Sequence, residues 1–426
     1  MTKLIESNYE MVNGKYYLLL ETGKRPSDEV TDNPNDIASL GGENISEEGF
    51  MKFDNVRYIT KKYFNTINKG KIQKEDILIN KDGAQTGKIA YISEIPFGKS
   101  MINEHIFIIR NNGGFDQKFL FYFLLSFIGQ KQIKSKIVGS AQGGISNSFI
   151  KGLYLPKPKK STQEKIASIL STVDNNIEQT KKTIEKAERL KKSMMQNLLS
   201  GKIKPDGSKR REDEFYIDDK FGQVPKGWEI KKGWQITNKI TKGQSPKWQG
   251  FDYCESGALF ITSENIKEGY LDIYKPKFLP VEFNDKLKNS QLKYGDILIN
   301  IVGASIGRSC LFKKDYKYAN INQAVCLFRL IEGFDNDFFA YFLQLKSTID
   351  RLMSNQVETA RANLSLGDFR KLKFIFPSDY KEQIKISKII NILCKKINSK
   401  KSKLVKLQKL KKSLMQNLLT GKFEVK

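Results

Sequence analysis

Two stretches of this chain carry apolar residues at helical spacing over many consecutive turns. The residues of the first stretch are Ile166, Ile169, Val173, Ile177, Ile184, Ala187, Leu190, Met194 and Leu198, and those of the second are Ile386, Ile389, Leu393, Ile397, Leu404, Leu407, Leu410, Leu414 and Leu418. Steps of three and four residues align an apolar stripe along one side of each lysine-rich helix. The stripes predict two long helices that pair as an antiparallel coiled coil, and the alternative is that each helix packs on its own globule.

The two helical stretches are copies of one sequence. LKKSMMQNLLSGK at Leu190–Lys202 returns 220 residues later as LKKSLMQNLLTGK at Leu410–Lys422, and each copy contains a glycine of the kind that commonly ends a helix. The repeat continues outside the helices, because EDILINKDGAQTGK at Glu75–Lys88 pairs with GDILINIVGASIGR at Gly295–Arg308. Self-similarity at this period indicates that the chain contains two copies of one folding unit.

Outside the helical stretches, short apolar runs alternate with glycine and asparagine turns, and each copy has one aromatic helix near its end. This pattern predicts the α+β class, with two tandem α/β domains separated by the two long helices and related by a pseudo-two-fold axis. The predicted boundaries are 1–158 for the first domain, 159–203 for the first helix, 204–214 for a polar linker, 215–378 for the second domain and 379–426 for the second helix.

The chain is strongly basic. Lysine and arginine total 73 against 47 aspartate and glutamate residues, which gives a formal net charge of +26. This excess favours a polyanionic partner, with nucleic acid as the first candidate, and a lysine-rich proteome is the alternative explanation. The cysteines Cys254, Cys310, Cys326 and Cys394 form no CxxC pair, which is typical of a reducing compartment. We expect a cytoplasmic protein that does not enter a membrane, because no secretion signal is visible and the most apolar run, Phe119–Ile128, is short.

Residues for catalysis are scarce. His105 is the single histidine, which excludes a histidine-rich metal site, and we expect it to be packed or to face a partner. The sequence has no NPPY-like loop for a flipped adenine and no GxGxxG or Walker A pattern. GAQTG (Gly83–Gly87) and GASIG (Gly303–Gly307) have the wrong spacing for phosphate binding, so we predict tight turns there. The sequence therefore predicts a binding protein with no catalytic or metal-binding residues.

The combination of repeated helix ends, paired GDILIN-type strands with glycine loops, and QVPKGWEI at Gln223–Ile230 resembles the specificity (HsdS) subunits of type I restriction–modification systems. The likeness extends over essentially the whole chain. It implies two target recognition domains, each reading one half of a split, asymmetric sequence in double-stranded DNA, with the helices setting the spacer. It also implies two modification subunits, which methylate adenine with S-adenosylmethionine, and restriction subunits that translocate and cleave DNA. No cofactor is expected in this chain itself.

Residues that differ between the copies are the candidates for reading DNA, because the two halves of such a target differ. Arginine can bond to guanine edges, and glutamine or asparagine can bond to adenine edges. The candidate DNA-binding residues are Lys24, Arg25, Arg57, Tyr58, Lys61, Gln142, Gln244, Lys247, Trp248, Gln249, Arg308, Thr359, Arg361 and Asn363. For each of them a solvated surface position is the alternative.

The repeated helix ends are candidate docking sites for two identical partner subunits. Their residues are Met195, Gln196, Asn197, Leu198, Met415, Gln416, Asn417 and Leu418. Gene duplication that preserved an ordinary helix explains the repetition equally well. A stand-alone DNA-binding protein with a regulatory or structural role is the alternative function, because charge and symmetry alone fit both.

Overall fold

The computed structural model describes residues 7–26, 29–139, 143–354 and 363–425. The chain divides into two compact units, the first made of Met1–Lys182 with Lys401–Lys426 and the second of Thr183–Lys400. Two long helices, α4 (Lys160–Leu199) and α10 (Tyr380–Leu418), both cross this division. Each unit therefore contains one globule together with one end of each long helix.

The first unit is built on two four-stranded sheets. One sheet has the order β2-β9-β6-β7 with antiparallel neighbours, and the other has the order β3-β5-β4-β8, in which β4 and β8 run parallel. The strands are β2 (Leu18–Thr22), β3 (Val30–Thr31), β4 (Ile37–Leu40), β5 (Arg57–Ile59), β6 (Ile77–Asn80), β7 (Ile89–Tyr91), β8 (Ser100–Ile102) and β9 (Ile106–Asn111). A further antiparallel pair joins β1 (Met11–Asn13) to β10 (Tyr154–Pro156).

The second unit repeats this topology. The order β14-β20-β17-β18 matches β2-β9-β6-β7, and the order β16-β15-β19 matches β5-β4-β8, again with one parallel pair. The strands are β14 (Thr237–Lys242), β15 (Ala258–Ile261), β16 (Lys277–Leu279), β17 (Ile297–Asn300), β18 (Ser309–Leu311), β19 (Ala319–Ile321) and β20 (Val325–Leu330). Two further antiparallel pairs are β13 (Trp228–Lys232) with β21 (Lys373–Pro377) and β11 (Phe215–Asp218) with β12 (Gly222–Pro225). The predicted tandem α+β architecture is confirmed.

Short helices complete each globule. The first unit has α1 (Lys61–Thr66), α2 (Gln117–Leu125) and α3 (Phe127–Lys134), and the second has α5 (Gly233–Ile236), α6 (Val281–Lys286), α7 (Asn336–Leu343), α8 (Lys346–Met353) and α9 (Leu366–Lys371). The 3₁₀ turns are η2 (Gly14–Tyr16), η3 (Gly42–Asn44), η4 (Asn147–Gly152), η5 (Glu212–Glu214), η6 (Lys247–Gln249), η7 (Lys288–Ser290) and η8 (Gly303–Ser305).

The predicted aromatic helices are α2 and α7, and both are buried. Each begins at an aspartate whose carboxylate accepts a backbone N–H of the first turn, Asp116 at 2.7 Å and Asp335 at 2.8 Å. Six consecutive residues of each helix lie in the core. Within the described part of the chain, no helix combines the length and the apolar character needed to cross a membrane.

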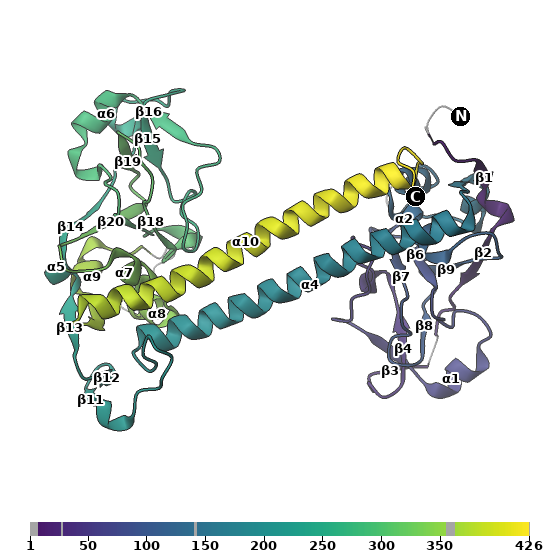
Figure 1. The fold of residues 1–426 in the computed structure, drawn as a ribbon, viewed down its shortest axis with the longest axis horizontal. Coiled ribbons are helices and arrows are strands. Elements are labelled where there is room, and N and C mark those ends of the chain that lie inside the picture. Colours follow the sequence, from purple (N-terminus) through teal and green to yellow (C-terminus); the bar gives the residue numbers. More distant parts are fainter. Residues whose placement is uncertain (1–6, 27–28, 140–142, 355–362, 426) are drawn as a thin grey trace. The chain divides into compact units, whose positions relative to one another are not determined.

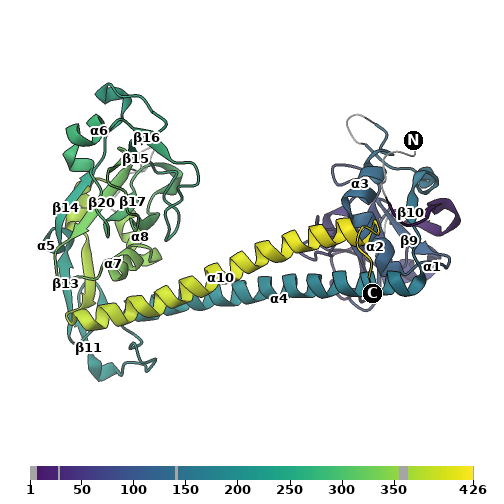
Figure 2. The same ribbon diagram turned by 45° about the horizontal axis from the view of Figure 1, so that its top comes forward.

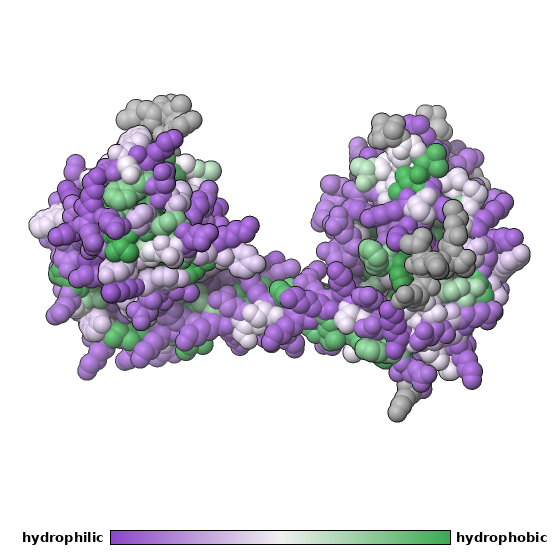
Figure 3. All heavy atoms as spheres, turned by 90° about the horizontal axis from the view of Figure 1, so that it is seen from above, coloured by the Kyte–Doolittle hydropathy of each residue, from purple (hydrophilic) through white to green (hydrophobic). Residues whose placement is uncertain are grey.

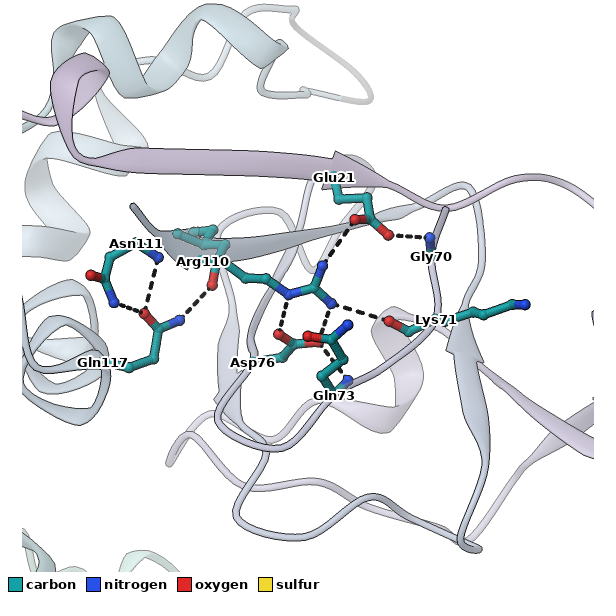
Figure 4. Close-up of polar contacts among 9 residues, drawn as sticks. Glu21, Gly70, Lys71, Gln73, Asp76, Arg110, Asn111 and Gln117 are labelled. Carbon is teal, nitrogen blue, oxygen red and sulfur yellow. Dashed lines mark hydrogen bonds and ion pairs between the residues drawn. The ribbon is translucent and has the colours of Figure 1, made fainter. Parts of the chain in front are cut away.

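A buried ion pair fixes the loop that precedes β6 in the first unit. Arg110 on β9 donates from Nε to one oxygen of Asp76 at 2.6 Å and from Nη2 to the other at 2.7 Å (Figure 4). The same guanidinium donates to Glu21 at 2.9 Å and to the carbonyl of Lys71 at 3.1 Å. Burial raises the pKa of the Asp76 carboxyl, and the hydrogen bonds from Arg110 oppose that rise. This fork of donors holds the entry to β6 against β9.

The second unit has the same device. Arg329 on β20 donates to the two oxygens of Asp296 at 2.8 and 2.7 Å and to the carbonyl of Gln291 at 3.2 Å. The carboxylate of Asp296 is 1% exposed. Because β6 and β17 are anchored in the same way, their far ends are set in equivalent positions in the two units.

In the first unit, the beginning of α4 packs against the end of α10. Ile166 and Leu170 of α4 share one apolar core with Met415 and Leu418 of α10 and with α2, and these elements lie side by side in both ribbon views (Figures 1 and 2). In the second unit, the end of α4 shares a core with the beginning of α10. The two helices therefore run antiparallel in each unit, as predicted.

A charged contact also joins the two helices in the first unit. Nζ of Lys411 on α10 lies 2.7 Å from one oxygen of Asp174 on α4, and the hydroxyl of Tyr122 on α2 donates to the other oxygen at 2.9 Å. All three side chains are largely buried. The carboxylate thus has a cation and a hydroxyl as partners, which offsets the cost of removing its charge from water.

The helix ends follow the predicted glycine signal. Gly201 and Gly421 both have φ of 71°, a left-handed conformation that favours glycine, and they follow α4 and α10 directly after the last turn. Beyond each glycine the chain turns back, because the carbonyls of Asn197 and Asn417 accept the N–H of Ile203 at 3.2 Å and of Lys422 at 2.9 Å. The face of each unit that is seen in Figure 3 is mainly hydrophilic with small hydrophobic patches.

Candidate nucleic-acid interface

In the first unit, three segments meet where β6 ends. The N–H of Lys81 donates to the carbonyl of His105 at 2.9 Å, and the N–H of Ile145 donates to the carbonyl of Lys81 at 2.7 Å. The exit of β6, the turn after β8 and the segment before η4 therefore lie side by side. We call the described residues 80–82, 103–105 and 143–145 the first junction.

The second unit contains the same arrangement. The N–H of Ile301 donates to the carbonyl of Ala324 at 3.0 Å, and the N–H of Leu364 donates to the carbonyl of Ile301 at 2.9 Å. Asn363 forms a backbone bridge with Val302. We call residues 300–302, 322–324 and 363–364 the second junction.

The turn in each junction is closed by an asparagine. The side-chain oxygen of Asn103 accepts the N–H of His105 at 3.0 Å, and that of Asn322 accepts the N–H of Ala324 at 3.1 Å. Side chains of this kind stabilise a turn by replacing a backbone acceptor. The backbone frame of the two junctions is therefore held by equivalent bonds, whatever side chains it presents.

The glycine loops lie next to the junctions and are tight turns, as predicted. The φ values of Gly83, Gly87, Gly303 and Gly307 are 77°, 88°, 79° and 81°, a region that favours glycine. Each loop is closed by its second glycine. The N–H of Gly87 donates to the carbonyl of Asn80 at 2.8 Å, and the N–H of Gly307 donates to the carbonyl of Asn300 at 3.0 Å. In the first unit the hydroxyl of Thr86 lies 2.7 Å from the carbonyl of Gly143, which ties the loop to the junction.

The loops after β2 and β14 also approach the junctions. A side chain at Gly23 would place its Cβ 2.1 Å from the carbonyl oxygen of Asn103, and one at Gly243 would place it 1.7 Å from that of Ile321. Only glycine fits this close backbone contact. Consequently Lys24 and Arg25, and in the second unit the segment from Gln244 to Gln249, start beside the junction turns.

The candidate residues of the first unit are three exposed basic residues and two residues of β5. Lys24, Arg25 and Lys61 are exposed, and the carbonyl of Arg25 accepts the hydroxyl of Tyr63 on α1 at 3.2 Å. Arg57 lies on β5 and pairs loosely with Glu43 at 3.7 Å. Tyr58, also on β5, is half-buried against the apolar cluster around β4, and its contact with DNA stays a prediction.

The candidate residues of the second unit lie in two places near its junction. Gln244, Lys247, Trp248 and Gln249 share one loop, in which the amide of Gln249 donates to that of Gln244 and the indole of Trp248 is 87% exposed. Arg308 follows the glycine loop and is exposed, and Asn363 belongs to the second junction itself. The remaining candidates Gln142, Thr359 and Arg361 lie outside the described residues.

Half of the predicted docking residues are core residues. Met195 and Leu198 are buried in the second unit, and Met415 and Leu418 are buried in the first. These four side chains fill equivalent cores in the two units, which gives a structural reason for the repeat, and their role in docking stays a prediction. Gln196 and Gln416 are exposed, and Asn197 and Asn417 are half-buried at the helix ends. The visible edge of Met415 and the side chain of Gln416 line a groove in the first unit.

Three functional candidates in the first junction were not among the predicted site residues. Nδ1 of His105 lies 2.7 Å from an oxygen of Asp82, and its Nε2 lies 3.5 Å from Glu104, whose carboxylate is 3.6 Å from Arg25. The imidazole is 52% exposed, so it is not packed in the apolar core. A comparison of the two copies could have found these residues, because the second copy has Val302, Gln323 and Ala324 at the equivalent positions.

Comparison with known proteins places both units in one family. Residues 17–189 and 249–409 match the family model described as type I restriction modification DNA specificity domain. The type I restriction enzyme MjaVIII specificity subunit of Methanocaldococcus jannaschii is 25% identical over 395 residues, which cover 89% of this chain and 87% of that protein. The EcoBI specificity subunit of Escherichia coli is 23% identical over 396 residues, which cover 88% and 79%.

Solved structures agree on the fold. The S subunit of a type I restriction–modification system from M. genitalium matches with a TM-score of 0.60 at 18% identity, covering 98% of this chain and 97% of that one. A second structure, whose title concerns complex assembly and conformational transition of the type I R-M system, matches with a TM-score of 0.53 at 15% identity. The match covers 98% of this chain and 99% of that one. With both units matched by the family model, the chain belongs to the type I restriction–modification DNA specificity family.

Proposed function

We propose that this chain is the DNA-reading subunit of a type I restriction–modification complex, and that each unit reads one half of a bipartite target in double-stranded DNA. The observation that carries the proposal is one backbone frame, present twice, with different side chains at its junction. The first junction has Asp82, Glu104 and His105 where the second has Val302, Gln323 and Ala324. Phosphate contacts carry no sequence information, so different half-sites require different side chains on a shared frame.

The charge of the chain supports the same proposal. A net charge of +26 supplies attraction to phosphates that does not depend on sequence. Exposed basic residues lie next to each junction, Lys24 and Arg25 in the first unit and Lys247 and Arg308 in the second. Affinity from such contacts falls as salt rises, whereas discrimination between bases depends on the side chains of the junctions.

Methyl transfer and DNA cleavage are assigned to partner subunits in this proposal. Two modification subunits with S-adenosylmethionine would methylate adenine, and restriction subunits would translocate and cleave DNA. The support is the family and the absence from the sequence of the NPPY-like loop that adenine methyltransferases use. In this proposal the chain selects the DNA sequence at which the reaction occurs, and it does not take part in methyl transfer or cleavage.

A groove in the first unit is the proposed docking surface for a modification subunit. It encloses about 760 Å³ and has an apolar floor that includes Phe50, Phe127, Ile177 and Met415. Lysines from both long helices line its edges, and the ring of Phe127 at the start of α3 is 79% exposed. The lining also includes Glu47, Glu48 and Asp174, so its charge is mixed, and its apolar side chains are complementary to an apolar segment of a partner.

Reconstitution tests the proposed division of labour. The chain and its modification subunit are assayed separately and together for transfer of labelled methyl groups from S-adenosylmethionine to DNA. The proposal predicts transfer only from the mixture, at specific adenines. Methylation by this chain alone would contradict it, and so would equal and equally specific methylation by the modification subunit without this chain.

The groove is tested by a change in one exposed ring. Phe127→Ser should weaken binding of the modification subunit by roughly tenfold or more, because an exposed aromatic anchor is replaced by a small polar side chain. The matched control is Phe97→Ser, which removes another exposed ring of the same unit that does not line the groove. Equal affinities of the two variants and the unchanged protein, measured by calorimetry, would reject the groove as the docking surface.

A further inference from the structure

The first junction contains a histidine whose orientation is fixed by a carboxylate. Nδ1 of His105 lies 2.7 Å from Oδ1 of Asp82, which is hydrogen-bonding distance. An ionised carboxylate accepts hydrogen bonds only, so this contact places the ring proton on Nδ1. With the proton on Nδ1, the lone pair of Nε2 lies on the side of the ring away from Asp82, with Nε2 itself 3.5 Å from the Glu104 carboxylate, so a donor placed there could bond to both acceptors.

Further acceptors surround this ring. The second oxygen of Asp82 and the carboxylate of Glu104, 3.5 Å from Nε2, both present lone pairs. Arg25 lies 3.6 Å from Glu104 and partly balances the two negative charges. The group is therefore rich in acceptors and keeps an excess of negative charge, because two carboxylates face one guanidinium, and this excess does not favour contact with phosphate.

Asp82, the partner of His105, also lines an open cleft. This cleft of about 670 Å³ is lined by Lys81 and Asp82, by Ser146, Asn147 and Ser148, and by apolar side chains. The side chains of Asp82 and His105 are 39% and 52% exposed, so both remain accessible to a ligand. Hydroxyl, amide and carboxylate groups around an accessible cleft are the residue types that bond to base edges.

Comparison of the two junctions separates this group from the frame that carries it. The turns are closed by the same asparagine bond, at 3.0 Å in the first junction and 3.1 Å in the second. The second junction holds its backbone without any of the three ionisable side chains, because Val302, Gln323 and Ala324 stand in their places. The Asp82–His105 pair is therefore not needed to form the turn, which makes it a candidate for recognition.

We propose that Asp82 and His105, together with Glu104, read an exocyclic amino group in the major groove, N4 of cytosine or N6 of adenine, at one position of the half-site of the first unit. These amino groups are the hydrogen-bond donors that bases present in the major groove, and they match a cluster of acceptors. His105 makes the base contact, and Asp82 positions it by holding the ring proton on Nδ1. The inference rests on the proposed function, since it names the feature of DNA that the first junction recognises.

The test uses the complex reconstituted with its modification subunit and a DNA library randomised at each position of the wild-type target. His105→Ala should lower discrimination at one position of one half-site by about tenfold and leave the other half-site unchanged. Asp82→Asn should relax the same position, because an amide can turn its donor group toward the ring and release the orientation of Nε2. Gln323→Ala, the matched change in the second junction, should leave discrimination at the half-site of the first unit as it is.

Each outcome decides the inference. Loss of discrimination at a single position whose preferred base carries a major-groove amino group supports it. An unchanged preference, or an equal loss at all positions, overturns it. Thermal melting of each variant separates folding from reading, and His105→Gln, which keeps a side-chain acceptor, decides the outcome if His105→Ala does not fold. Failure of the wild-type complex to select any bipartite target would refute the proposed function itself and is seen before a variant is made.

Discussion

At the scale of single residues, burial decides what an aspartate does in this protein. Asp76 and Asp296 are almost fully buried, and each is gripped by both ends of an arginine fork. Asp82 is 39% exposed and holds a histidine at the surface instead. The sequence does not distinguish these roles, because all three lie close to the DILIN strands. The two structural aspartates recur in both copies, whereas Asp82 is replaced by Val302 in the second.

The buried arginine fork should be important for stability. Asp296→Ala removes the carboxylate that pairs with Arg329 and leaves the cation without its partner, so we expect a loss of about 3 kcal/mol. Asp337→Ala is the control, because Asp337 pairs with the more exposed Lys313 at 2.7 Å and should cost less than about 1 kcal/mol. Urea unfolding of both variants checks the difference. Equal losses would show that the fork contributes no more than a surface pair.

Cysteine reactivity should follow burial in the same way. Burial raises the pKa of Cys310 to about 12 and also raises that of Cys326, so at pH 8 almost no thiolate is present at either residue. Cys254 is exposed and should be the first thiol to react with a disulfide reagent in the folded protein. Cys254→Ser should remove the fast phase, whereas Cys310 and Cys326 should react only on unfolding. A fast phase that survives in Cys254→Ser and maps to Cys310 would contradict this order.

At the scale of elements, the sequence predicted the two long helices but not the junctions. The stripes of α4 and α10 repeat every three to four residues, and the glycines that end them have positive φ, so local pattern and structure agree. The junctions join segments that are distant in sequence, such as Lys81 with His105 and Ile145. No periodic pattern reports such contacts. The difference between the copies at Asp82 and His105 is the one sequence signal of the junctions, and it was not used in the prediction.

Sequence alone also does not show whether the predicted docking residues are buried or exposed. The repeat at Met195 and Met415 is a true signal, but sequence cannot distinguish a side chain that fills its own core from one that waits for a partner. Burial assigns both methionines to the cores of their own units. Exposed aromatic residues such as Phe127 were not predicted, because one exposed ring in a helix leaves no periodic signature.

The packing of α10 in the second unit can be tested with two isoleucines that differ in burial. Ile390 is fully buried and Ile392, two residues further on, is 64% exposed. Ile390→Ala should lower the free energy of unfolding by about 3 kcal/mol, because it opens a cavity in the core, whereas Ile392→Ala should change it by less than about 0.5 kcal/mol. The transition of the second unit in urea provides the measurement. A similar small effect of both changes would mean that α10 is not packed as described.

At the scale of the whole molecule, duplication supplies two reading units, and the long helices are continuous through both. Each unit contributes its own frame, core and junction, so a change at one junction should leave the other unit intact. The proposed role of α4 and α10 is to fix how many base pairs separate the two half-sites. A helix is suited to this role because its length is set by its number of residues.

The spacer prediction follows from helix geometry. Removing seven residues from the middle of α4 and seven from the middle of α10 keeps the apolar stripes in phase and shortens each helix by about 10 Å. We therefore expect the spacer in the methylated sequence to shorten by roughly three base pairs, with both half-sites unchanged. Removing three residues from each helix serves as the comparison, because it rotates the stripes out of phase and should abolish activity. A spacer of unchanged length in the seven-residue variant would reject this role of the helices.

The most direct measurement of the central claim is the sequence that the complex methylates. Cells that express this chain with its modification subunit, and matched cells without this chain, are mapped for N6-methyladenine by single-molecule sequencing. Two units with different junctions predict methylation that depends on this chain and occurs at two short, dissimilar blocks separated by a fixed run of unread bases. A continuous palindrome, or the same methylation in cells that lack the chain, would contradict the account.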